Sequence, residues 1–93
     1  MMSATDIQLN IKGEWQEAER KYGPFKSTHE GYGVLAEEVL ELLEAIRSNT
    51  PERVQYEAVQ IAAVAQRIAE CVCLPATRER SGMKPPRGAT ESG

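Results

Sequence analysis

Four glutamates lie close together in the middle of the chain, in a segment that otherwise has the apolar content of a packed helix. They are Glu37, Glu38, Glu41 and Glu44, and only Arg47 offers a positive charge nearby. Carboxylate oxygens are the ligands that hard divalent cations prefer in proteins. Glutamates gathered at the edge of a helical core therefore indicate a metal-dependent site.

Helical geometry separates these side chains into two groups. At about 100° per residue, Glu38 lies at the border of the apolar face, and Glu41, three residues later, lies next to it. Glu37 and Glu44 lie further towards the solvent. Another carboxylate, Glu57, falls inside the apolar arc of the next helix, where an ionised side chain requires a cation, a basic partner or water. We therefore expect Glu38, Glu41 and Glu57 to converge closely enough to share one ion.

A solvated acidic stripe is the alternative interpretation, and the residue pattern leaves it open. The glutamates of residues 37–44 would then only add to solubility, and Glu57 would lie near enough to the start of its helix to reach water. A zinc signature is not present in the sequence, because His29 has no partner at ligand spacing.

Three helices and no strands are predicted, because apolar residues recur at steps of three and four. Gly23 ends the first helix, Ser27 begins a capping box with Glu30 for the second, and Thr50 caps the third. The short turn at 47–50 favours an antiparallel arrangement of the second and third helices. The predicted ranges are about 4–22, 28–47 and 51–73.

The chain is expected to form one all-α domain at 1–76, followed by a tail at 77–93. The tail contains consecutive prolines, three glycines and almost no apolar residues, so we interpret it as disordered. An arm that becomes ordered on a partner is the alternative for this segment.

More apolar residues are present on the third helix than one neighbour can cover, and three helices of this size bury little surface alone. We therefore expect a homo-oligomer, most simply a two-fold dimer whose helix pairs form a four-helix bundle, with a tetramer left open. The apolar repeat comprises Val54, Ala58, Ile61, Ala65, Ile68 and Val72, and the additional apolar residues are Val59, Ala62, Ala63, Val64 and Ala69.

Charge and hydropathy exclude two classes of partner. Residues 1–76 contain seven Lys and Arg against twelve Asp and Glu, a net charge of −5, so direct nucleic-acid binding is not expected. The chain has no apolar run of about 18 residues and no basic N-terminal region before an apolar stretch, so neither a membrane span nor a signal peptide is expected. Cys71 and Cys73 would point apart on a helix, and a reduced, cytoplasmic protein is the default expectation.

Two segments resemble the MazG-like all-α nucleoside triphosphate pyrophosphohydrolases, most closely the small phage- and prophage-type members. They are KYGPFKSTHEGYGVLAEEVLELLEAI at 21–46 and EAVQIAAVAQRIAE at 57–70. The family motif is E-E-x-x-E followed, on an antiparallel helix, by E-x-x-D. Residues 37–41 fit the first half, and Glu57 fits the second, but Gln60 stands where the motif has aspartate.

The resemblance implies a Mg²⁺ site, with Mn²⁺ as the alternative ion. Glu38, Glu41, Glu57 and Gln60 would be the ligands, and Glu37 and Glu38 would act in catalysis. The reaction implied is hydrolysis of an NTP or dNTP to the monophosphate and pyrophosphate. Because Gln60 removes one negative charge, Mg²⁺ is expected to bind more weakly and the activity to be weak.

An acidic protein would bind an anionic nucleotide through such a metal and a few other side chains. The candidates for contact with the substrate are Lys21, Lys26, Arg67 and Trp15. The alternative function is a non-catalytic helical homodimer that acts as an interaction or nucleotide-binding module. In that case Glu57 would be paired with Arg53, with Arg67 or across the dimer.

Overall fold

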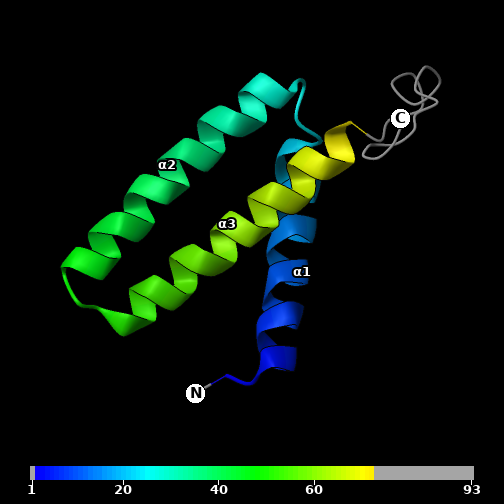
Figure 1. Cartoon of the computed structure of the whole chain (residues 1–93). Helices are drawn as coiled ribbons and strands as arrows, with labels where there is room; N and C mark the ends of the chain where they lie inside the picture. The colour runs from blue at the N-terminus through cyan, green and yellow to red at the C-terminus, as the bar shows by residue number, and fades with distance from the viewer. Residues whose placement is uncertain (1, 73–93) are drawn as a thin grey trace, which may run out of the picture.

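The computed structural model describes residues 2–72, and within this range the chain forms three helices and no strand. They are α1 at Ala4–Tyr22, α2 at Thr28–Arg47 and α3 at Pro51–Cys71 (Figure 1). The predicted all-α class is confirmed, although α3 ends at Cys71 rather than at residue 73. The predicted tail at 77–93 lies outside the described residues. In the described part of the chain, no helix has the length and hydropathy that a membrane span requires.

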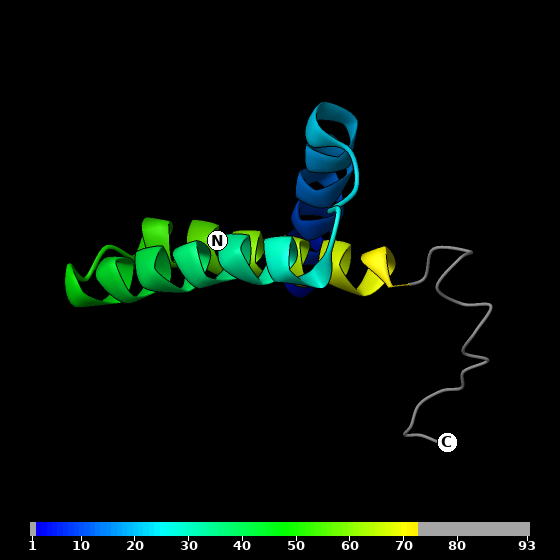
Figure 2. The same cartoon turned by 90° about the horizontal axis from the view of Figure 1, so that it is seen from above.

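α3 is the central helix, because α1 and α2 both pack against it. α2 and α3 lie side by side in opposite directions, as the short turn between them predicts (Figure 1). Figure 2 shows that these two helices form a flat layer and that α1 projects from one side of it. The two sides of the α2–α3 layer are therefore different, and among the described helices only α1 covers one of them.

Polar caps explain where the first two helices begin. The hydroxyl of Ser3 accepts a hydrogen bond from the Asp6 N–H at 3.1 Å, and the Asp6 carboxylate accepts one from the Ser3 N–H, which is a complete capping box. Ser27 accepts from the Glu30 N–H at 3.1 Å. The Glu30 carboxylate, however, accepts the Lys26 N–H at 2.6 Å rather than that of Ser27, so the predicted second capping box is only half formed.

The turns show one further difference from the sequence-based prediction. Thr50 occupies the N-cap position of α3, but its side chain makes no capping bond and lies 3.0 Å from the Ser48 hydroxyl instead. Asn49 has φ 57° and Gly23 has φ 77°, the left-handed backbone that asparagine and glycine tolerate best. These two residues redirect the chain after α2 and after α1.

A small apolar core forms where the end of α3 meets the start of α2. Phe25, Val64 and Cys71 are buried there, and Val34, Leu35 and Ile68 pack against them. The Cys71 thiol also donates to the carbonyl of Phe25 at 3.6 Å. A core of this size leaves large apolar side chains uncovered, which is expected of a chain with so few residues.

One face of α2 is apolar and is not covered by the other described helices. Tyr32, Val39, Leu43 and Ile46 follow one another at steps of seven, four and three, so they lie on one side of the helix. Each is exposed, from 40% for Leu43 to 68% for Tyr32. We call this set the α2 apolar stripe.

Gly31 allows α2 to approach α3 closely. A Cβ atom at this position would lie 2.6 Å from Cγ1 of Ile68 and 3.1 Å from Cδ2 of Phe25, whereas nothing lies within 4 Å of the equivalent position at Gly33.

We expect Gly31→Ala to lower the free energy of unfolding by about 1–3 kcal/mol through overpacking. Gly33→Ala should raise it by up to about 1 kcal/mol, because alanine favours the helix. Urea denaturation of both variants checks this prediction, and effects of the same sign would contradict it.

Candidate metal centre

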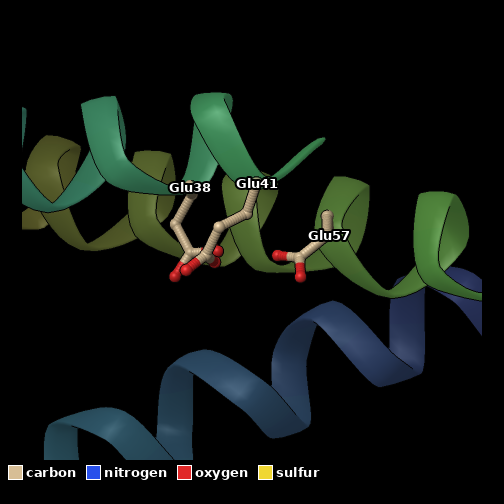
Figure 3. Close-up of side chains that lie close together, drawn as sticks. All are labelled: Glu38, Glu41 and Glu57. Carbon is tan, nitrogen blue, oxygen red and sulfur yellow. The ribbon is translucent and has the colours of Figure 1, made fainter. Parts of the chain in front are cut away.

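Three carboxylates from two helices meet on the side of the α2–α3 layer that faces α1 (Figure 3). Glu38 and Glu41 project from α2 and Glu57 from α3, and one oxygen of each lies within 4.8 Å of the others. Two oxygens that bind one cation at about 2.0–2.6 Å cannot lie more than about 5 Å apart. The predicted convergence is confirmed, and its dimensions suit one shared ion.

The helical hairpin explains why these residues meet. Glu41 and Glu57 lie eight residues before and eight residues after Asn49, the left-handed residue of the turn. Closing an antiparallel pair about that turn places the two positions opposite each other. Glu38 lies one helical turn from Glu41 on the same face, so its side chain reaches the same place.

Burial leaves two of these carboxylates without the partners that such groups normally require. Glu57 is only 6% exposed, and the Oε1 atoms of Glu57 and Glu38 are buried without a hydrogen-bond partner among residues 2–72. Within residues 2–72 no basic side chain forms an ion pair with this cluster. The suggested pairing of Glu57 with Arg67 is wrong for the described chain, because Arg67 pairs with Glu19. An unpaired buried carboxylate is costly, so the cluster favours either bound protons or a cation.

The pKa of Glu38 reflects this environment. Burial raises the pKa of Glu38 from 4.5 to about 7, and the neighbouring carboxylates of Glu57 and Glu41 act in the same direction. Repulsion within the cluster therefore contributes to the raised pKa of Glu38, although burial is the larger cause. A divalent cation would compete with the proton held here.

Stability should therefore depend on pH in a way that metal reverses. Because the pKa of Glu38 is higher in the folded than in the unfolded protein, the folded state binds the proton more tightly, and the stability of the metal-free protein should fall between pH 5 and pH 8. Mg²⁺ should raise the melting temperature at pH 8 and have little effect at pH 5. Glu38→Gln should weaken both the pH dependence of stability and the effect of Mg²⁺ at pH 8. The same pH dependence of the melting temperature in the unaltered protein and in Glu38→Gln would contradict the raised pKa of Glu38.

Gln60 lies close to one turn after Glu57 on α3 and is half-buried. Its Nε2 is buried without a hydrogen-bond partner. As a metal ligand, Gln60 would have to use its amide oxygen Oε1. A 180° rotation of the amide group exchanges the positions of Oε1 and Nε2. The ligand role of Gln60 stays a prediction. Glu37 is exposed, and its catalytic role also stays a prediction.

Arg67, a candidate for substrate contact, primarily connects helices. It is 6% exposed, its Nε donates to Glu19 at 3.0 Å, and its Nη2 donates to the carbonyl of Gly23 at 3.0 Å. Its guanidinium carbon also lies 4.0 Å from the centre of the Phe25 ring. These contacts hold the end of α1 and the segment that follows it against α3.

The other predicted substrate residues lie at different levels of exposure. Lys21 is exposed beside the Tyr22 ring, Lys26 is exposed in the segment between α1 and α2, and Trp15 is half-buried on α1. Their roles in substrate binding stay predictions. None of the three lies in the carboxylate cluster.

Tyr56 borders the cluster, and sequence reasoning did not single it out. The pKa of its phenol is raised by burial and then by the charges of Glu14, Glu57, Glu38 and Glu41. Glu14 lies on α1, so a carboxylate of that helix also raises the pKa of Tyr56, in addition to those of α2 and α3. The only signal in the sequence was that Tyr56 directly precedes Glu57, and adjacent residues of a helix point in different directions.

Comparisons of the chain with protein-family models, with curated proteins and with solved structures found no match. The functional conclusion therefore depends on the residues, on the geometry that brings three of them together, and on the motif resemblance at residues 21–70.

Proposed function

We propose that this protein is a Mg²⁺-dependent nucleotide pyrophosphohydrolase that cleaves an NTP or dNTP to the monophosphate and pyrophosphate. The observation that carries the proposal is the cluster of Glu38, Glu41 and Glu57, in which two buried oxygens lack any partner. The order of these glutamates also follows the family motif that the sequence resembles. A solvated stripe would account for Glu41, which is exposed, but not for Glu57, which is buried.

Each residue has a chemical task in this proposal. Glu38, Glu41 and Glu57 hold the cation through carboxylate oxygens, and the amide oxygen of Gln60 completes the set. The bound Mg²⁺ supplies charge neutralisation at the phosphates and an activated water. Glu37, exposed next to Glu38, orients the attacking water. Because its pKa is about 7, Glu38 exchanges a proton near neutral pH when no ion is bound.

Pyrophosphate release from a panel of NTPs and dNTPs, with Mg²⁺ or Mn²⁺, tests the proposed function. Glu38→Gln is the inactive control. Gln60→Asp should tighten Mg²⁺ binding by about ten- to a hundredfold, because it returns one negative charge to the ligands. Full activity in the unaltered protein with no change in Gln60→Asp would show that position 60 is not a ligand. If neither protein binds metal or nucleotide, the interaction-module function replaces the enzyme.

A homodimer is the proposed assembly, and the α2 apolar stripe favours it. The stripe would pack against the same stripe of a second copy and complete a four-helix bundle. A non-catalytic homodimer is the second candidate function, since the stripe alone would support it. The hydrolysis measurements separate the two functions, because both require the dimer but only one requires the carboxylates.

Val39→Glu should convert the dimer to a monomer without unfolding the chain, because Val39 is 47% exposed and a glutamate there can reach water in the monomer. Leu9→Glu on α1, where Leu9 is 62% exposed, is the matched control and should leave the dimer intact. Light scattering coupled to size-exclusion chromatography measures both. A monomeric unaltered protein at micromolar concentration would contradict the proposed assembly.

A further inference from the structure

A cavity of about 290 Å³ lies where the three helices meet, at the end of the hairpin away from its turn. Its walls come from the end of α1, the segment that joins α1 to α2, the first two turns of α2 and one residue of α3. Its lining side chains include those of Tyr22, Phe25, Lys26, Glu30, Val34 and Arg67. The volume lies just below the range for small-molecule sites, about 300–1,000 Å³.

The cavity combines an aromatic wall with a buried hydrogen-bond donor. Arg67 is more than nine-tenths buried, and its Nε and Nη2 are held by Glu19 and by the Gly23 carbonyl. Its Nη1 makes no hydrogen bond within residues 2–72, and guanidinium groups carry five N–H donors. Tyr22 is 69% exposed and lines the same space, so its ring can pack on a ligand.

The charges of this cavity are balanced, which distinguishes it from a phosphate site. Glu19 neutralises Arg67. Lys26 and Glu30, which both line the cavity, carry opposite charges, and the Glu30 carboxylate also accepts the backbone N–H of Lys26 at 2.6 Å. A balanced cavity does not attract a polyanion. Its aromatic and apolar walls, with one directional donor, suit a flat, uncharged ring that presents an acceptor atom.

The cavity lies next to the carboxylate cluster. Val34 lines the cavity, and Glu38 follows it by four residues, which is about 6 Å along the helix axis. On α3, Arg67 lies ten residues beyond Glu57, or about 15 Å. One nucleotide can therefore extend from the cavity to the cluster.

We propose that this cavity holds the base of the nucleotide, an inference that rests on the proposed function. The Nη1 donor of Arg67 favours bases with a carbonyl oxygen, such as guanine and uracil, over adenine, which has none. The Tyr22 ring stacks on the base. The phosphates then extend along α2 to the metal held by the carboxylates.

Nucleosides test this assignment without metal or phosphate. The ¹⁵N-labelled chain is titrated with guanosine, uridine and adenosine in the absence of divalent cations. Saturable shifts are expected at the amides of Phe25, Lys26, Glu30, Val34 and Arg67, with guanosine and uridine binding at least about threefold more tightly than adenosine. Shifts confined to other residues, or equal affinity for the three nucleosides, would overturn the proposal.

Two variants complete the test. Val34→Phe fills the cavity and should abolish nucleoside binding, whereas Leu9→Phe adds a phenylalanine at an exposed position of α1 and should have no effect. Because Val34 is half-buried, Tyr22→Ala, at an exposed position, provides a second variant that does not threaten the core. It should weaken binding by about five- to tenfold through lost stacking. Unchanged binding in both Val34→Phe and Tyr22→Ala would overturn the assignment.

The outcome is separable from that of the proposed function. Metal-dependent hydrolysis with no nucleoside shifts at the cavity would refute the base site and leave the metal site standing. Nucleoside binding at the cavity by a protein that neither binds metal nor hydrolyses NTPs would refute the hydrolase and with it the placement of phosphates on the cluster.

Discussion

Glu57→Gln is expected to abolish divalent-cation binding and, at the same time, to stabilise the metal-free protein. The amide keeps the shape of the side chain but removes a buried charge that lies against Glu38 and Glu41. Metal affinity should fall by more than about 100-fold, since loss of an outer-shell partner alone costs about 10–100-fold. The melting temperature without metal should rise, because repulsion and desolvation are relieved. Calorimetric titration and thermal melts measure the two effects.

Glu52→Gln is the matched control for this experiment. It removes the same charge from the first turn of the same helix, at an exposed position. Metal affinity should be unchanged in this variant. An equal loss of affinity in both variants would mean that net charge, rather than a site, attracts the cation. Retention of tight binding in Glu57→Gln would show that Glu57 is not a ligand.

Arg67→Ala is expected to cause the largest loss of stability of any substitution considered. It removes the partly buried ion pair with Glu19, the hydrogen bond to the Gly23 carbonyl and the stacking on Phe25. Breaking a buried ion pair typically costs about 3–5 kcal/mol. Because the Glu19 side chain is 25% exposed, we expect a loss towards the lower end of this range, which is still a large part of the stability of a small domain. Arg67→Lys should recover little, because an ammonium cannot make both hydrogen bonds in the plane of the guanidinium.

Arg20→Ala provides the comparison for Arg67→Ala. Arg20 also pairs with a glutamate, Glu17, but both side chains are more than half exposed. Such pairs contribute between about 0 and 1 kcal/mol. Urea denaturation followed by circular dichroism should separate the two variants clearly. Similar midpoints would contradict the structural role assigned to Arg67.

The convergence of the carboxylates could be predicted from the sequence because it depends on local rules. The helical period places Glu38 and Glu41 on one face, and a short turn sets which residues of the next helix lie opposite them. Glu57 was recognised because a charge interrupts an apolar arc. These signals require only the second and third helices and the turn between them.

The role of Arg67 could not be predicted in the same way. Its partner Glu19 lies 48 residues earlier in the chain, and the pairing depends on how α1 packs on α3. No periodicity specifies that packing. The hydrogen bonds of Glu30 and Thr50 differ from the expected caps for a related reason, since several local donors and acceptors compete for the same side chain.

The sequence also could not predict that Tyr56 and Glu14 lie near the carboxylate cluster. Tyr56 lies on the helix that carries Glu57, but its electrostatic environment is set by carboxylates of all three helices. The cavity lined by Tyr22 and Arg67 likewise requires the segment after α1 to fold back on α3. Sites assembled from three elements are visible only in the folded chain.

Titration of the unaltered chain with Mn²⁺, followed by paramagnetic broadening of its amide resonances, tests the central claim most directly. Mn²⁺ accepts the same oxygen ligands as Mg²⁺. One ion per chain should bind saturably, and broadening should centre on Glu38, Glu41 and Glu57 and disappear in Glu57→Gln. Absence of saturable binding at low ionic strength, with or without a nucleotide, or broadening centred elsewhere, would contradict the metal site.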